Sequence, residues 1–188
     1  MWTVSLTQYY TATTLDGFIA DADNSLDWLF TRNRDPDGPL SYGAFIADVG
    51  AMAMGSTTYE WILDHEFGGK DPQEWKWPYE IPCWVFTHRQ LRVVSGAPIE
   101  FTSMDVATVH ERMVQAARGR NVWIVGGGDL VGQFAEEGLL DEVLVSIARR
   151  SLWVRVRLCF LAGIELRLDE LAQNGDFACA RFSVVRSA

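Results

Sequence analysis

The sequence predicts a single α/β domain with a largely parallel sheet, extended near the carboxyl end by antiparallel strands. Three observations predict it. The chain has 188 residues, 48% of them hydrophobic, which suits one domain with a full core. Its first two-thirds alternates apolar runs with helical patterns, whereas the pattern of its last third predicts strands with little helix between them. An Asn174–Gly175 pair between two late strands is a strong hairpin signal.

The amino-terminal elements follow from local patterns. "WTVSLTQYYTAT" predicts a first strand, because Trp2, Val4 and Leu6 alternate with polar positions. The Asp-, Asn- and Gly-rich run "TLDGFIADADNSLDW" is typical of a loop. "LSYGAFIADVG" predicts a short helix and "AMAM" a short buried strand. "STTYEWIL" predicts another helix, because its Ser and Thr residues are helix-start signals.

Strands and helices continue to alternate after a long loop, "GGKDPQEWKWPYEIP". "CWVFT" and "IEFTS" predict strands. The next helix has Val106, Val109, Met113 and Ala117 at helical spacing, with Ser103 as its candidate N-cap. "VWIV" predicts a strand and "DLVGQFAEEGLL" a helix. The expected late strands are "DEVLVSIA", "LWVRVRL", "IELRLDEL" and "FACARFSVV".

Composition excludes several classes of function. The net charge of −9 disfavours nucleic-acid binding by the molecule as a whole. No apolar run has the length of a membrane span, and the amino terminus lacks a signal-peptide pattern, so we expect a cytoplasmic protein. We expect neither a disulfide framework nor a metal site, because the cysteines and histidines are few and dispersed: Cys83, Cys159, Cys179, His65, His88 and His110.

Three consecutive glycines lie at the junction between a predicted buried strand and a predicted helix in "NVWIVGGGDLVGQF". At the carboxyl end of a sheet strand, Gly126 and Gly127 would let the backbone approach a ligand closely. The free N–H groups and the dipole of the following helix favour a phosphate. A tight turn without a ligand explains the glycines equally well, and their spacing differs from the GxGxxG dinucleotide fingerprint.

Two further strand ends carry polar residues. After "AMAM", the helix opens with Gly55, Ser56, Thr57 and Thr58, which could cap the helix or hold a phosphate. After "CWVF" come Thr87, His88 and Arg89. An extended diphosphate ligand accounts for these features together better than three unrelated turns.

The order "TLDGFIA", "MGSTTYE", "VFTHR", "VWIVGGGDL" and "GLLDEVLVSIA" resembles the dihydrofolate-reductase-like superfamily. The resemblance is closest to the branch of the riboflavin-biosynthesis reductase domain, the carboxyl-terminal domain of bacterial bifunctional deaminase-reductases. It covers residues 4–148 and resumes near residue 164. It implies a three-layer α/β/α sandwich and an NADPH-dependent reductase.

The resemblance also implies roles for individual residues. Ala12 and Ile19 would lie against the nicotinamide, and residues 55–58 would hold a cofactor phosphate. Thr87, His88 and Arg89 would face the adenosine 2′-phosphate, with Arg89 favouring NADPH over NADH. The diphosphate would be held by Gly126, Gly127, Gly128, Asp129 and Leu130. The superfamily implies a cis peptide between Gly126 and Gly127.

The candidate catalytic acids are Asp16 and Asp27. Dihydrofolate reductase itself places a carboxylate on the helix before "AMAM", but here the only acid of that helix, Asp48, comes late, which argues against folate as substrate. Asp16, in "TLDG", matches an acid of the riboflavin-type branch. An Asp16–Gly17 turn is the alternative interpretation.

The segment over residues 149–163, "RRSLWVRVRLCFLAG", departs from the family pattern. GC-rich codons for residues 150–163, read in a neighbouring frame, can spell Pro-Val-Thr-Leu-Gly-Ser-Gly-Ala-Pro-Leu-Leu-Pro-Arg-Arg, which is the kind of string the family places there. We therefore hypothesise two compensating frameshifts; gene codons incompatible with that string would exclude them. A divergent strand is the alternative, because Leu152, Val154 and Val156 alternate with larger or charged residues.

The sequence thus predicts one domain over residues 1–188 that uses NADPH to reduce a small pterin- or pyrimidinone-like heterocycle or a carbonyl compound. By resemblance, it forms a homodimer. The alternatives are a non-catalytic nucleotide-binding protein and a purely structural domain of the same fold. Most tryptophans are expected in the core, and the "EWKWPYE" loop is expected to wall the cleft or a dimer contact.

Overall fold

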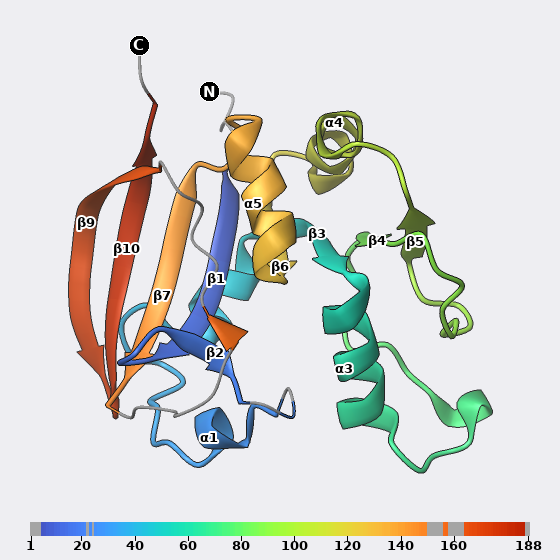
Figure 1. Cartoon of the computed structure of the whole chain (residues 1–188), viewed down its shortest axis with the longest axis horizontal. Coiled ribbons are helices and arrows are strands. Elements are labelled where there is room, and N and C mark those ends of the chain that lie inside the picture. The colour runs from blue at the N-terminus through green and yellow to red at the C-terminus, as the bar shows by residue number, and fades with distance from the viewer. Residues whose placement is uncertain (1–4, 22, 24, 150–155, 158–163, 187–188) are drawn as a thin grey trace.

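The computed structural model describes residues 5–21, 23, 25–149, 156–157 and 164–186. Its main sheet is built from β1 (Thr7–Thr14), β3 (Val49–Gly55), β4 (Cys83–Phe86), β5 (Ile99–Thr102), β6 (Asn121–Gly126), β7 (Glu142–Ala148), β9 (Glu165–Asn174) and β10 (Phe177–Val185). Among the described residues these eight strands lie in the order β5-β4-β3-β6-β1-β7-β10-β9 (Figure 1). A separate pair joins β2 (Phe18–Ala20) to β8 (Val156–Arg157).

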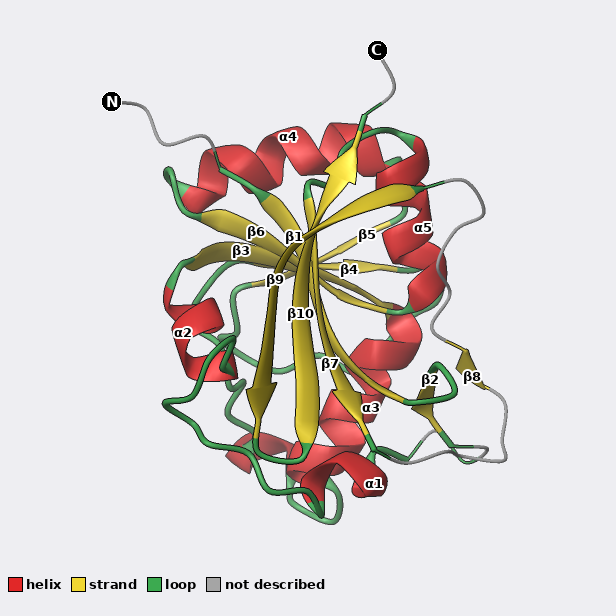
Figure 2. Cartoon of the chain, turned by 90° about the vertical axis from the view of Figure 1, so that its left-hand side faces the viewer, coloured by secondary structure: helices red, strands yellow, loops and turns green. Residues whose placement is uncertain are grey.

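The sheet is parallel from β5 to β7 and antiparallel at β10 and β9, as the sequence predicts. β9 and β10 form a hairpin that turns at Gly175, whose φ of 57° favours glycine. The twist of the sheet is visible as a fan of strands in Figure 2. Because β1, β3, β4 and β6 are parallel, their carboxyl ends open toward the same edge of the sheet.

Helices cover both faces of the sheet. They are α1 (Asp27–Phe30), α2 (Tyr42–Ala47), α3 (Ser56–Phe67), the 3₁₀ turn η1 (Pro72–Glu74), α4 (Val106–Ala117) and α5 (Gly128–Glu136). On one face, α4 and α5 pack in a core that includes Met113 and Phe134; on the other, α2 and α3 pack around Phe45 and Leu63. This is the expected three-layer α/β/α sandwich.

Strand β3 shows why the sheet needs both layers. Its residues from Val49 to Met54 are all buried, as expected for a central parallel strand covered on both sides. Ala51 belongs to the core under α4 and α5, whereas Met52 belongs to the core under α3. A Cβ atom on Gly50 would lie 2.4 Å from the carbonyl oxygen of Ala117, so the end of α4 can approach only a glycine.

Three local expectations need correction. Helix α4 is capped by Asp105, whose side chain accepts a hydrogen bond from Thr108 N, and not by Ser103. The run expected to be a loop after β1 contains both β2 and α1. β1 begins only at Thr7, whereas Trp2 and Val4 lie outside the described residues.

Other expectations concern segments that the structure describes only in part. Of the atypical segment, Val156–Arg157 forms β8, and residues 150–155 and 158–163 lie outside the described residues. Cys83 and Cys179 are buried free thiols, and Cys159 lies outside the described residues. Within the described ranges, no helix combines the length and apolarity that crossing a membrane requires.

Candidate functional site

A cavity of about 750 Å³ opens where the carboxyl ends of β1, β3 and β6 meet the first turns of α3 and α5. Ligands bind at this edge in open α/β sheets. The structure brings most of the predicted cofactor residues together in its wall: Ala12, Ile19, Gly55, Ser56, Thr57, Thr58, Gly126, Gly127, Gly128, Asp129 and Leu130. Residues 71 positions apart in the sequence, Gly55 and Gly126, thus share one wall.

The first turns of α3 and α5 converge at this cavity. A Cβ atom on Gly55 would lie 3.6 Å from the amide nitrogen of Gly127, and a Cβ on Gly126 would lie 3.7 Å from Thr58 Oγ1. Gly55 and Gly127 are the N-caps of the two helices, and neither helix has a side-chain capping hydrogen bond. The amides of both first turns therefore lack the side-chain partner that a capping Ser or Thr would provide.

The space beside the glycine backbone is open and is not filled by neighbouring atoms. A Cβ atom built on Gly127 would meet nothing within 4 Å, and Gly127 has an ordinary φ of −77°. Gly126 has a φ of 140°, which L side chains rarely adopt. The peptide between Gly126 and Gly127 is cis, so that prediction is confirmed. Gly127 thus presents bare backbone to the cavity.

The positive potential at this part of the cavity comes mainly from backbone N–H groups. Among the described lining residues, the only charged side chain is Asp129, which is exposed in the first turn of α5. Because a carboxylate repels a phosphate, Asp129 can serve an anionic ligand through its backbone N–H and not through its side chain. Two helix dipoles and their free N–H groups then provide the positive potential.

Most of the remaining lining of the cavity is apolar or aromatic, and the sequence analysis missed most of it. We refer to these residues as the apolar wall: Ala20, Leu26, Leu29, Trp61, Ile62, Tyr79 and Val125. Tyr79 belongs to the "EWKWPYE" loop that was expected to wall the cleft, whereas Trp75 and Trp77 of that loop pack against the core below α3. The phenol of Tyr79 is protonated at neutral pH and can donate a hydrogen bond, and burial raises its pKa further.

Thr87, His88 and Arg89 follow β4 but do not line the cavity, although the preceding residue, Phe86, does. The Arg89 guanidinium is exposed and lies 2.7 Å from the carboxylate of Glu60 on α3. Thr87 Oγ1 accepts a hydrogen bond of 2.9 Å from Arg89 N. Their contact with a 2′-phosphate stays a prediction.

The two candidate acids lie outside the cavity wall. Asp16 is exposed in the turn after β1, where Thr14 Oγ1 donates to its carboxylate and Gly17 has a φ of 81°. This geometry matches the alternative interpretation of a turn. Asp27 is exposed at the start of α1. A catalytic role for Asp16 or Asp27 stays a prediction.

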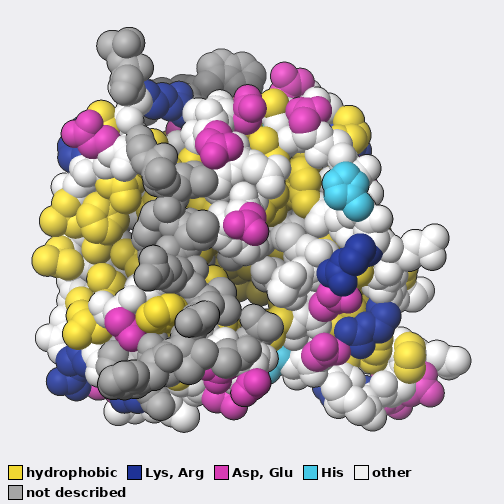
Figure 3. All heavy atoms as spheres, in the orientation of Figure 1, with side chains coloured by type: hydrophobic (Ala, Val, Ile, Leu, Met, Phe, Trp, Pro, Cys, Tyr) yellow, Lys and Arg dark blue, Asp and Glu magenta, His cyan; other side chains and the backbone are white. Residues whose placement is uncertain are grey.

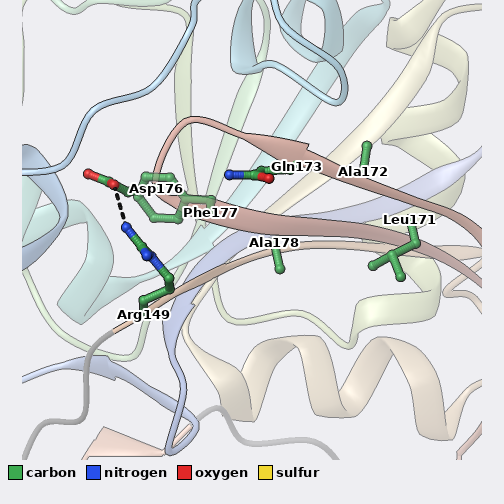
Figure 4. A pocket seen from close by; sticks show the side chains of 7 residues that line it. All are labelled: Arg149, Leu171, Ala172, Gln173, Asp176, Phe177 and Ala178. Atoms are coloured by element: carbon green, nitrogen blue, oxygen red, sulfur yellow. Dashed lines mark hydrogen bonds and ion pairs between the residues drawn. The ribbon is translucent and has the colours of Figure 1, made fainter.

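A second cavity, of about 530 Å³, lies beside the β9–β10 hairpin (Figure 4). Arg149 reaches Asp176 there at 3.2 Å, but its side chain is 83% exposed, so the pair is weak. No predicted site residue lines this cavity. Among the described residues, no group of three His, Cys, Asp or Glu side chains could hold a metal ion.

The sequence pattern of the RibD C-terminal domain matches residues 56–171, which is more than half of the chain. The chain belongs to the RibD C-terminal domain family. The match starts at Ser56, the first residue of α3, and includes the glycine-marked start of α5. The chain is also 30% identical over 149 residues to the uncharacterized protein YwjB of Bacillus subtilis, and the aligned region covers 75% of each chain.

Solved structures agree with this RibD C-terminal fold. A Shewanella protein assigned to riboflavin biosynthesis superimposes with a TM-score of 0.79 at 20% identity, covering 96% of this chain and 99% of its own. The deaminase and 5-amino-6-(5-phosphoribosylamino)uracil reductase of Thermotoga maritima gives 0.63 at 13% identity. This chain covers 57% of that protein, and 96% of this chain is matched. Dihydrofolate reductase from Enterococcus faecalis, complexed with NADP(H), gives 0.57 at 11% identity, covering 98% of this chain and 99% of its own.

Proposed function

We propose that the protein is an NADPH-dependent reductase of a small heterocyclic or carbonyl substrate. The observation that carries this proposal is the meeting of two uncapped helix starts at one cavity, with Gly127 open to it. Such an arrangement suits the diphosphate of a dinucleotide. The Thermotoga and Enterococcus structures are of proteins named as reductases, and the latter is complexed with NADP(H), which supports the proposed NADPH-dependent reductase function.

The described residues fit such a cofactor. The amides of residues 126–129 and 55–58 would hold the phosphates, whereas Leu130 N already donates to Gly127 O at 3.0 Å. Ala12 on β1 and Ile19 on β2 would flank the nicotinamide. When bound, NADPH supplies a hydride to the substrate. The apolar wall, including Leu29 and Ile62, would align the substrate and exclude water.

Thermal unfolding tests the proposal, because a ligand that binds only the native state must stabilise it. NADPH at about a hundred times its Kd adds about 2.7 kcal/mol, which raises the Tm of a domain of this size by roughly 5–10 °C. NADPH oxidation is then measured across a panel of pterins, pyrimidinones and carbonyl compounds. Stabilisation with oxidation supports the reductase, and stabilisation without oxidation supports a non-catalytic nucleotide-binding protein. The absence of stabilisation would favour a purely structural or interaction domain of the same fold.

We also infer that two copies associate through the sheet face of β9 and β10. Figure 3 shows hydrophobic side chains gathered over these strands, at the left of the view. Leu168 is 53% and Leu171 68% exposed, and the half-buried Phe182 lies beside Leu168 on the same face. Exposed apolar side chains clustered in this way are typical of protein interfaces. A variant with Leu168→Asp and Leu171→Asp should be monomeric by light scattering if wild type is dimeric.

A further inference from the structure

Three rings stack in parallel beside the cavity. The ring centroids of Trp61 and His65 are 4.7 Å apart with 12° between planes, and those of His65 and Phe30 are 5.1 Å apart with 14° between planes. Phe30 and Trp61 are 6.4 Å apart, with 11° between their planes. We refer to Phe30, Trp61 and His65 as the ring stack.

The ring stack joins the two elements that form the apolar wall. Phe30 ends α1, whose neighbouring residue Leu29 lines the cavity, and Trp61 lies on α3 beside Ile62, which also lines it. His65 is one helical turn beyond Trp61 on the same helix face. The stack therefore fixes the plane of the Trp61 indole while that indole borders the cavity.

One face of the indole is left uncovered by the ring stack. Two rings that sandwiched the indole would be separated by two layers of van der Waals contact, which is about 7 Å. Phe30 and His65 are only 5.1 Å apart, so they do not sandwich it. Trp61 is half-buried and lines the cavity, so it can offer a flat surface of fixed orientation to a ligand.

The chemistry around this surface selects a ligand class. Leu26, Leu29 and Ile62 make the neighbouring wall apolar, and Tyr79 adds one phenol. A phosphate buried against these leucine and isoleucine side chains would lose its hydration without a compensating partner from them. A flat uncharged ring keeps its favourable contacts there and gains stacking with the indole.

Resting on the reductase function proposed above, we propose that Trp61 determines specificity by stacking on a flat, uncharged and unphosphorylated heterocyclic substrate. The substrate named for the Thermotoga relative carries a phosphoribosyl group, so the two specificities would differ. An open-chain carbonyl compound would gain little from the indole face. This narrows the proposed substrates to planar ring systems.

Calorimetric titration with lumazine, a flat uncharged bicyclic probe, tests this specificity on the free and the NADPH-saturated protein. Trp61→Leu keeps apolar bulk but removes the ring, so the Kd for lumazine should rise about tenfold; Trp61→Phe should stay within about threefold of wild type. Trp75→Ala is the matched control, because Trp75 stacks on Phe67 and does not line the cavity. It should leave lumazine binding unchanged.

Uridine and uridine 5′-monophosphate provide a second comparison, because they share a flat ring and differ by one phosphate. We expect the monophosphate to bind no more tightly than uridine. The inference is overturned if lumazine does not bind, if Trp61→Leu binds it as well as Trp61→Phe does, or if the phosphate tightens binding tenfold. Failure of the reductase proposal is read separately, as failure of NADPH to bind, while lumazine binding to the free protein still reports on Trp61.

Discussion

Replacing Gly127 with alanine separates a ligand cradle from a structural turn. Gly127 has a φ of −77°, and an added Cβ would meet nothing within 4 Å, so the folded protein can hold the methyl group without a clash. Gly→Ala at a compatible position stabilises a protein by about 0.4–1 kcal/mol through the unfolded state. Alanine at an N-cap costs about as much. The net change in the free energy of unfolding should be within about 1 kcal/mol, or roughly 4 °C in Tm.

The same methyl group would stand in the space where a diphosphate approaches the amides of α5. Losing one hydrogen bond to a charged group costs about 1.5–3 kcal/mol, so the Kd for NADPH should rise at least about tenfold. Gly43→Ala on α2 is the matched control, because its Cβ would meet only Pro36 O, at 3.8 Å, and Gly43 does not line the cavity. It should leave NADPH binding unchanged.

Titration of NADPH and urea unfolding of the two variants give the comparison. An unchanged NADPH Kd in Gly127→Ala, with the fold intact, would refute the idea that this bare backbone contacts the cofactor. A large loss of stability would show that the glycine is needed for packing, against the open space around its Cβ position.

Three other substitutions test separate parts of the account. Arg89→Ala should raise the Kd for NADPH about tenfold and leave NADH binding unchanged in titrations, because only NADPH carries the 2′-phosphate. In urea unfolding, Asp105→Ala should cost about 1 kcal/mol by uncapping α4, whereas Ser103→Ala should change stability by less than about 0.5 kcal/mol. Burial lowers the pKa of His110 below 6.5, so its unfolded state binds the proton more readily and the free energy of unfolding should fall as pH drops below about 6.5, less so in His110→Gln.

Contrary results are equally specific. Equal losses of NADPH and NADH affinity in Arg89→Ala would remove the assigned 2′-phosphate contact. Equal effects of the Asp105 and Ser103 variants would contradict the observed N-cap. An identical pH dependence in wild type and His110→Gln would show that burial of this histidine does not govern stability in acid.

The sequence predicted the layers and the polar half of the site because both depend on local patterns. Buried runs such as that of β3 mark central strands, and glycines before a helix mark places where the backbone either turns tightly or is left bare. Parallel strands then bring Gly55 and Gly127 to one edge, which makes their proximity a consequence of topology.

The apolar half could not be predicted in the same way. Trp61 faces the cavity only because α1 lies across from α3, and α1 falls in a stretch whose Asp, Asn and Gly content is typical of a loop. Asp105 was missed as the N-cap because Ser103 has the same capping chemistry, and only the backbone decides which residue precedes the first turn. The apolar lining of the cavity and the N-cap of α4 therefore depend on tertiary contacts and backbone geometry that local sequence patterns do not specify.

A crystal structure grown with excess NADPH tests the central claim most directly. The account predicts density for the diphosphate against the amides of Gly126, Gly127 and Gly128, with the second helix start at Ser56 beside it and the nicotinamide near Ile19. An empty cavity at saturating NADPH, or a cofactor bound elsewhere on the molecule, would contradict it.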